Sequence, residues 1–188
     1  ALALVTTAGG FVFGSMTFLV PRYFEISMVN ISQSAAFSGF LASLVFAIAS
    51  FSQVYVGWLI DRISPKRTLL AMAAGQIIFV YFSAQYLDAE LLIIMTLAMC
   101  FVFGQIPITD AIMARYVPDE YRGRVLSIKF LLNLTVGAMV LPFCGYLLQI
   151  GYVMSDLFFI ISIVASLIFL AGLVLPEQEG VSLKTIKD

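Results

Sequence analysis

The sequence contains no histidine, only two cysteines and few charged residues. Without histidine, the chain cannot supply a histidine proton relay, a haem ligand or a histidine-based zinc site. Cys100 and Cys144 both fall inside apolar runs, so neither a disulfide framework nor a thiolate metal site is expected. We therefore predict no metal site and no cofactor.

The shortage of charge excludes a soluble globular domain. Charged residues make up 11% of the 188 residues, whereas soluble domains average about 25%. Hydrophobic residues make up 62%, and the mean hydropathy is +1.05. Several apolar runs approach or exceed the roughly 20 residues that a helix needs to cross a bilayer. The sequence therefore predicts an all-α integral membrane protein, with membrane lipid as a partner and no nucleic acid.

The apolar runs predict a bundle of six transmembrane helices within residues 1–175. The predicted spans are about 1–20, 35–60, 68–86, 91–117, 125–150 and 154–175. Pro107 is expected to interrupt the fourth span. Residues 176–188 are polar and lack an apolar face, so we expect a cytoplasmic tail.

Lysine and arginine are distributed unevenly among the connections. The second and fourth connections hold three each and the tail two, whereas the first holds one and the third and fifth none. Cytoplasmic loops of membrane proteins carry an excess of these cations. The asymmetry places the second and fourth connections, the tail and, by parity, the N-terminus in the cytoplasm.

The densest cluster of charge follows the second span. Its spacing is Gly-x-Leu-x-Asp-Arg-x-x-x-Lys-Arg, and its residues are Gly57, Asp61, Arg62, Lys66 and Arg67. This resembles the signature loop between the second and third helices of each six-helix half in the major facilitator superfamily of secondary transporters. Ser64 stands where a glycine is common, and Pro65 where a basic residue is common. The alternative for this motif alone is an ordinary positive-inside loop.

Asp61 follows the C-terminal end of an apolar helix, where the helix dipole disfavours an acid. We expect it to have a cationic partner or to face the N-terminus of a neighbouring helix. In a transporter, that contact would break and re-form. The alternative is a solvated acid at the membrane interface.

A second motif, Pro-x-x-x-Arg-Gly-Arg, spans residues 118–124. It resembles the loop between the tenth and eleventh helices of many such transporters. Gly123 is expected to relieve the backbone at a tight start of the next helix. Arg122 and Arg124 are expected to anchor that helix at the headgroups.

A shift of 90 positions aligns the first span with the fourth and gives seven identities in a 20-residue window. The matching residues are Leu2, Thr6, Ala8, Phe11, Val12, Phe13 and Gly14 with Leu92, Thr96, Ala98, Phe101, Val102, Phe103 and Gly104. Helices one and four would run in opposite directions, so the match predicts an inverted three-plus-three repeat. The alternative is chance matching between two helices rich in Phe, Leu and Ala.

The two motifs together cover nearly the whole chain as helices seven to twelve of a twelve-helix transporter. The resemblance implies one half of a protein that moves a small solute by alternating access, with ion coupling left open. Its partners would be the solute and a missing N-terminal half, suggested also by a chain that opens inside an apolar run without methionine. We expect a bacterial inner membrane as its location.

Two other classes of protein are consistent with a helical membrane bundle. A non-transporting membrane receptor or scaffold on the same fold stays open, because fold does not fix function. An integral membrane enzyme would need a cluster of nucleophile, base or metal ligands near an interface. The intramembrane ionisable residues Asp110 and Lys129 do not make one, so we predict that the chain is not an enzyme.

The resemblance assigns the first, second, fourth and fifth helices to the solute pathway. The candidate residues on these helices are Thr6, Gln53, Gln105, Asp110, Lys129 and Asn133. Asp110 and Lys129 should lie at similar depth, about 8–11 Å inside the cytoplasmic ends of their helices. They either pair in one access state and separate in the other, or contact water and headgroups independently.

Overall fold

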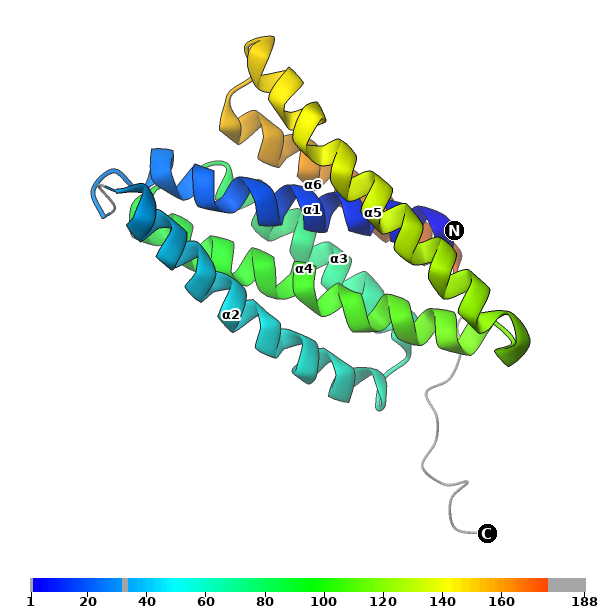
Figure 1. Ribbon diagram of the computed structural model, residues 1–188. Coiled ribbons are helices and arrows are strands. Elements are labelled where there is room, and N and C mark those ends of the chain that lie inside the picture. The colour runs from blue at the N-terminus through cyan, green and yellow to red at the C-terminus, as the bar shows by residue number, and fades with distance from the viewer. Residues whose placement is uncertain (1, 32–33, 176–188) are drawn as a thin grey trace.

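The computed structural model describes residues 2–31 and 34–175, and these residues form six α-helices and no strand (Figure 1). The helices are α1 (Leu2–Ser27), α2 (Ala35–Ile60), α3 (Pro65–Ser83), α4 (Asp88–Tyr116), α5 (Asp119–Gln149) and α6 (Met154–Val174). The predicted tail, residues 176–188, lies outside the described residues. The six-helix fold class is confirmed.

Five of the helices, all except α3, are long and apolar enough to cross a membrane. The exception, α3, has only 19 residues, and Lys66 and Arg67 in its first turn lower its hydropathy. It begins three residues before the predicted third span and ends at Ser83 rather than at residue 86. Pro65 occupies its first position, which suits proline because the first N–H of a helix has no partner within the helix.

Two prolines at which the sequence predicts a break lie inside helices, as Pro142 does in α5. The first helix continues through Pro21 to Ser27, seven residues beyond the predicted end of the first span. Pro107 lies inside α4, so the expected interruption of the fourth span is wrong. Each proline removes one backbone hydrogen bond, but the backbone in lipid has no water to bond instead, and the flanking turns stay helical.

The connection between α4 and α5 is shorter than predicted. Only Val117 and Pro118 separate the helices, and the following residues form the first turns of α5. Asp119 and Glu120 favour this start because acids stabilise the positive end of the helix dipole. Gly123 therefore lies inside a helix, and a Cβ there would meet nothing within 4 Å. Its expected role in relieving a tight backbone turn is wrong.

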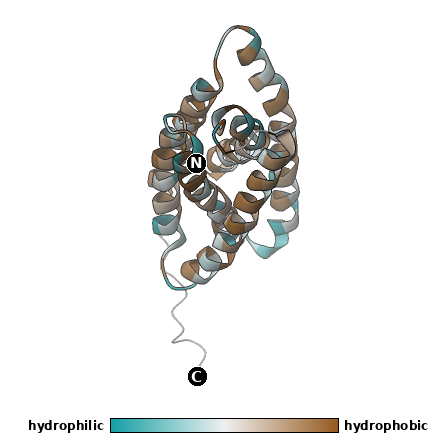
Figure 2. Cartoon of the chain, turned by 90° about the vertical axis from the view of Figure 1, so that its left-hand side faces the viewer, coloured by the Kyte–Doolittle hydropathy of each residue, from teal (hydrophilic) through white to brown (hydrophobic). Residues whose placement is uncertain are grey.

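The helices pack in two groups joined along the middle of the bundle. In one group α1 packs against α5 and α6, in the other α4 packs against α2 and α3, and α3 and α6 pack together (Figure 1). Many large apolar side chains, among them Phe51, Val54 and Val174, are exposed, and apolar residues recur along the helices (Figure 2). In the apolar 18-residue stretch of α5 only 11% of the residues are buried, compared with 44% in the corresponding stretches of α1, α4 and α6. Most of α5 therefore has no partner among the described residues.

We call the end of the bundle that holds the α2–α3 and α4–α5 connections the basic end. It carries Arg62, Lys66, Arg67, Arg115, Arg122 and Arg124. At the opposite end, the Asn30 side-chain amide and backbone N–H both donate to the Asp88 carboxylate, at 2.6 and 3.1 Å. These bonds connect the α1–α2 loop to the start of α4.

Candidate functional site

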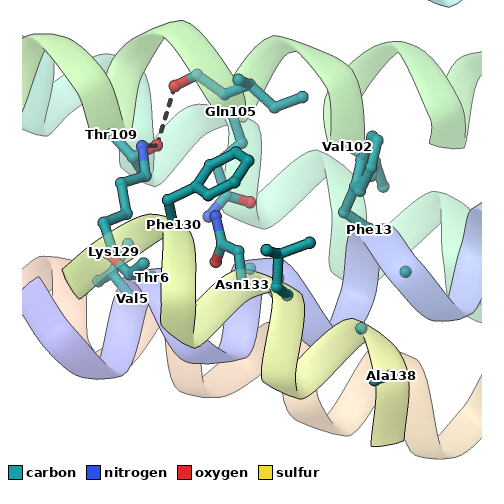
Figure 3. A pocket seen from close by; sticks show the side chains of 16 residues that line it. Val5, Thr6, Phe13, Val102, Gln105, Thr109, Lys129, Phe130, Asn133 and Ala138 are labelled. Atoms are coloured by element: carbon teal, nitrogen blue, oxygen red, sulfur yellow. Dashed lines mark hydrogen bonds between the residues drawn. The ribbon is translucent and has the colours of Figure 1, made fainter. Parts of the chain in front are cut away.

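A cavity of about 540 Å³ lies between α1, α4 and α5. Its lining residues recur at helical spacing, so one face of each helix forms its wall. On α1 these residues are Val5, Thr6, Gly9, Gly10, Phe13 and Gly14. On α4 they are Val102, Gln105, Ile106 and Thr109. From α5 come Lys129, Phe130, Asn133, Leu134, Gly137 and Ala138 (Figure 3).

Glycines let α1 approach the polar side chains of its neighbours. A Cβ on Gly9 would lie 2.9 Å from Gln105 Nε2, and one on Gly10 would lie 2.7 Å from Asn133 Oδ1. Both distances are too short for a real Cβ, so the two amides take the space that side chains would fill. Further along α1, a Cβ on Gly14 would lie 3.5 Å from the Gly137 Cα, as close packing at a Gly-x-x-x-Gly pair predicts.

The charged group of the cavity wall is Lys129, which reaches from α5 to α4 (Figure 3). Its Nζ forms an ion pair with the Asp110 carboxylate and donates a hydrogen bond of 3.2 Å to Thr109 Oγ1. The side chain of Lys129 is only 11% exposed, whereas that of Asp110 is 54% exposed. A largely buried ammonium is thus paired with a carboxylate that water can reach.

An amide pair links the cavity wall to α3. Gln76 is completely buried, and its Nε2 donates to Gln105 Oε1 at 2.5 Å and to the Phe101 carbonyl oxygen at 3.1 Å. These bonds fix the orientation of the Gln105 side chain, because its oxygen is already engaged. They also explain why α3, a helix expected to pack outside the pathway, carries a glutamine.

Three polar atoms of the wall are buried without a hydrogen-bond partner within the part of the chain that the structure describes. They are Thr6 Oγ1, Gln105 Nε2 and Asn133 Oδ1. They come from three different helices and converge on one turn of α1, since the two amides contact Gly9 and Gly10. Buried polar groups are nearly always bonded, so three exceptions in one wall require an explanation.

The structure brings together most of the predicted pathway residues. Thr6, Gln105, Lys129 and Asn133 line the cavity, and Asp110 joins them through its ion pair with Lys129. Gln53 is half-buried on α2 and does not line it.

Sequence reasoning missed Thr109, Gln76 and the two phenylalanines Phe13 and Phe130. The sequence could have indicated Thr109, because it lies four residues after Gln105 and therefore on the same helical face. The contribution of Gln76 depends on how α3 and α4 meet, and helical spacing carries no information about that.

Asp61 ends α2 as its C-terminal cap and is exposed. Its carboxylate forms no ion pair with any described residue, so the expected cationic partner is not found among residues 2–31 and 34–175. Arg62 instead lies over the Trp58 ring, 3.9 Å from its centroid. The role of Asp61 in a contact that breaks and re-forms stays a prediction, with a solvated acid as its alternative.

The remaining motif residues lie at the basic end. Gly57 is half-buried in α2, with no atom within 4 Å of a Cβ placed there. Arg67 is exposed at the start of α3, and Arg124 is exposed in α5. Arg122 donates to the Ala114 carbonyl oxygen at 2.7 Å and pairs with Asp119 at 2.6 Å.

The six-helix fold and its apolar surface define an integral membrane protein. The sequence matches the model of the Major Facilitator Superfamily over residues 2–187, and the chain belongs to this family. It is a family of transporters and not of enzymes, in agreement with the prediction from the absent catalytic cluster. A comparison with curated protein sequences found no match.

The fold of the chain resembles those of solved transporter structures. A mutant of the peptide transporter POT in complex with alafosfalin matches with a TM-score of 0.77 and 17% identity, over 92% of this chain and 36% of that chain. The proton:xylose symporter XylE bound to 6-bromo-6-deoxy-D-glucose matches with a TM-score of 0.79 and 18% identity, over 94% and 44%. The chain therefore spans less than half of either transporter, and the likeness concerns the fold.

Proposed function

We propose that this chain is the C-terminal half of a secondary active transporter that moves a small solute by alternating access. In this proposal the ion pair between Asp110 and Lys129 forms in one access state and separates in the other. Its presence between α4 and α5, at the wall of the cavity, is the observation that carries the proposal. The pair makes Asp110 the candidate carboxylate for ion coupling.

The energetics of the pair support this role. A charge without a partner is costly inside a bilayer, roughly 2.5–3.5 kcal/mol at a helix centre on insertion scales and less near the ends. Lys129 can therefore leave Asp110 only when water or another charge replaces the carboxylate. Opening of the bundle on the basic side would supply that water, and protonation of Asp110 or binding of a cation would favour the separation.

The unpartnered apolar faces of α2 and α5 support the proposal of an upstream six-helix half. Phe51 and Val54 on α2 are 76% and 74% exposed, and Phe130 and Leu131 on α5 are 67% and 65% exposed. A second half packed there would close the cavity on its open side. The test is the reading frame upstream of Ala1, where six more apolar spans are expected. An upstream frame without them would contradict this part of the proposal.

The lysine and arginine asymmetry supports an orientation with the basic end in the cytoplasm, in a bacterial inner membrane. The asymmetry comes from the lysines and arginines of the basic end. On the other side, the first predicted connection has a single one, Arg22.

A charge-exchange series tests the transport proposal in vesicles. Asp110→Asn and Lys129→Gln should each abolish uptake or efflux, and the exchanged double variant Asp110→Lys with Lys129→Asp should recover part of it. Glu25→Gln is the matched control, because the exposed pair of Glu25 with Arg22 lies at the opposite end of α1. Normal transport by either single variant contradicts a functional pair. Vesicles of the wild-type protein that move no solute would favour the alternative of a receptor or scaffold.

A further inference from the structure

The three unpartnered polar atoms differ from ordinary surface polar groups. Thr6 and Gln105 are only 4% and 5% exposed, although both line the cavity. A buried donor or acceptor that gives up water without gaining a partner destabilises the folded protein. An apolar residue of similar shape in place of Thr6 or Asn133 would lose no side-chain hydrogen bond to a described residue, and in Gln105 only the oxygen is bonded, to Gln76. Three such atoms in one wall point to a ligand that supplies the missing partners.

The neighbours of each group decide whether its free atom is a hydrogen-bond donor or an acceptor. Gln76 occupies Gln105 Oε1, so the free atom of Gln105 is the Nε2 donor. The free atom of Asn133 is the Oδ1 acceptor, and the Thr6 hydroxyl can act in either sense. A matching ligand carries at least one acceptor and one donor.

The charge of the wall favours an uncharged ligand. Lys129 is the ionisable residue of the wall, and its ammonium is already bound to Asp110 and Thr109. An anion or a cation would lose hydration in the cavity without meeting an unpaired opposite charge. The remaining wall is mostly apolar, and Phe13 and Phe130 present rings to the ligand.

We propose that the cavity binds an uncharged solute with an amide or alcohol group on an apolar body, held by Gln105, Asn133 and Thr6. Gln76 acts as a positioning residue that keeps the Gln105 donor available. The inference rests on the proposed function and adds to it that different residues perform two tasks. Neutral groups bind the solute, and the Asp110–Lys129 pair opens and closes during the transport cycle.

The first experiment measures the thermal stability of the ligand-free protein, purified in detergent from its complete gene. Thr6→Val and Asn133→Leu should raise the Tm by about 2–4 °C, because each removes an unpartnered polar atom and keeps the branching of the side chain. Thr109→Val is the matched control and should lower the Tm. Its hydroxyl donates to the Ile106 carbonyl oxygen at 2.8 Å and accepts from Lys129. A fall in Tm for both Thr6→Val and Asn133→Leu would show that these atoms are structural, and would overturn the proposal.

The second experiment compares three ligands that share a benzene ring and differ in charge: neutral benzamide, anionic benzoate and cationic benzamidine. Benzamide should stabilise the wild-type protein against heat more than either charged analogue does, and Gln105→Leu should reduce the stabilisation by benzamide. Gln85→Leu, an exposed position beyond the end of α3, is the control and should preserve it. Equal or stronger stabilisation by a charged analogue overturns the proposal, and so does the absence of any effect of benzamide.

The proposed positioning role of Gln76 is tested by a ligand preference, which a purely structural role would leave unchanged. In Gln76→Leu the Gln105 amide is free to turn, so it can present either its nitrogen or its oxygen. The preference for acetophenone, which only accepts, over aniline, which chiefly donates, should therefore fall from the wild-type ratio toward one. An equal loss of both affinities would mark Gln76 as structural only. These outcomes are separate from transport: a preference for a charged ligand overturns the inference, while normal transport by Asp110→Asn overturns only the proposed ion-pair cycle.

Discussion

Lys66, in the first turn of α3, donates a hydrogen bond of 2.9 Å to the carbonyl oxygen of Leu173 in the last turn of α6. The other two helices that end at the basic end have a similar partner. Arg115 donates to the Ile60 carbonyl oxygen of α2 at 3.3 Å, and Arg122 donates to the Ala114 carbonyl oxygen of α4. Each cation satisfies a carbonyl that its helix leaves free and faces the negative end of a helix dipole. Basic residues at this end thus connect helices within the bundle.

Lys66→Met should lower the free energy of unfolding by about 0.3–1 kcal/mol, because the last turn of α6 loses its cation. The measurement is the Tm in detergent at low ionic strength, where the dipole interaction is screened least. Lys66→Arg is the control and should retain most of the stability. Equal Tm values for the two variants would mean that the bond contributes nothing.

Asp61→Asn should reduce the transport rate about tenfold or more, which corresponds to about 1.4 kcal/mol, while the amount of protein in the membrane stays unchanged. The reason is that the acid opposes the dipole at the end of α2 and lacks an ion-pair partner among the described residues in this state. We expect it to find one in another state of the cycle. Glu120→Gln, an exposed acid in the first turn of α5, is the control. Wild-type transport by Asp61→Asn would identify Asp61 as a solvated interfacial acid.

Single cysteines should report the orientation of the bundle in intact cells. The background replaces the free Cys100 and Cys144 by serine and alanine. A cysteine at Ile63, which is 41% exposed at the basic end, should react only with reagent that reaches the cytoplasm. One at Val29, which is 66% exposed at the opposite end, should react from outside. Labelling of both positions from the same side would rule out the predicted topology.

Gly10→Leu should destabilise the protein by about 1–3 kcal/mol, since even a Cβ at this position would lie 2.7 Å from Asn133 Oδ1. The added side chain would also fill part of the cavity, so ligand binding should be lost together with stability. Gly145→Leu in α5 is the control, because a Cβ there would meet nothing within 4 Å. The measurement is thermal unfolding in detergent, and equal Tm values for the two variants would contradict close packing of α1 on α5.

The sequence alone was sufficient for the class of protein and for the number of helices. Long apolar runs with few charges form helices that cross a membrane, because only a helix satisfies all backbone hydrogen bonds of such a run in lipid. The two loop motifs indicated the family. Helix ends were predicted less well. Pro21 and Pro107 predict breaks, because proline ends most helices in water, but α1 and α4 stay helical past them. The inverted repeat stays a prediction.

The sequence also determined which faces of α4 and α5 carry polar residues, because helical spacing alone places Gln105 with Thr109, and Lys129 with Asn133. Only the tertiary structure decided which faces meet. The bond of Gln76 to Gln105 and the contacts of the two amides with Gly9 and Gly10 depend on how four helices cross. Crossing geometry follows from side-chain packing between residues far apart in the chain, so no local pattern encodes it.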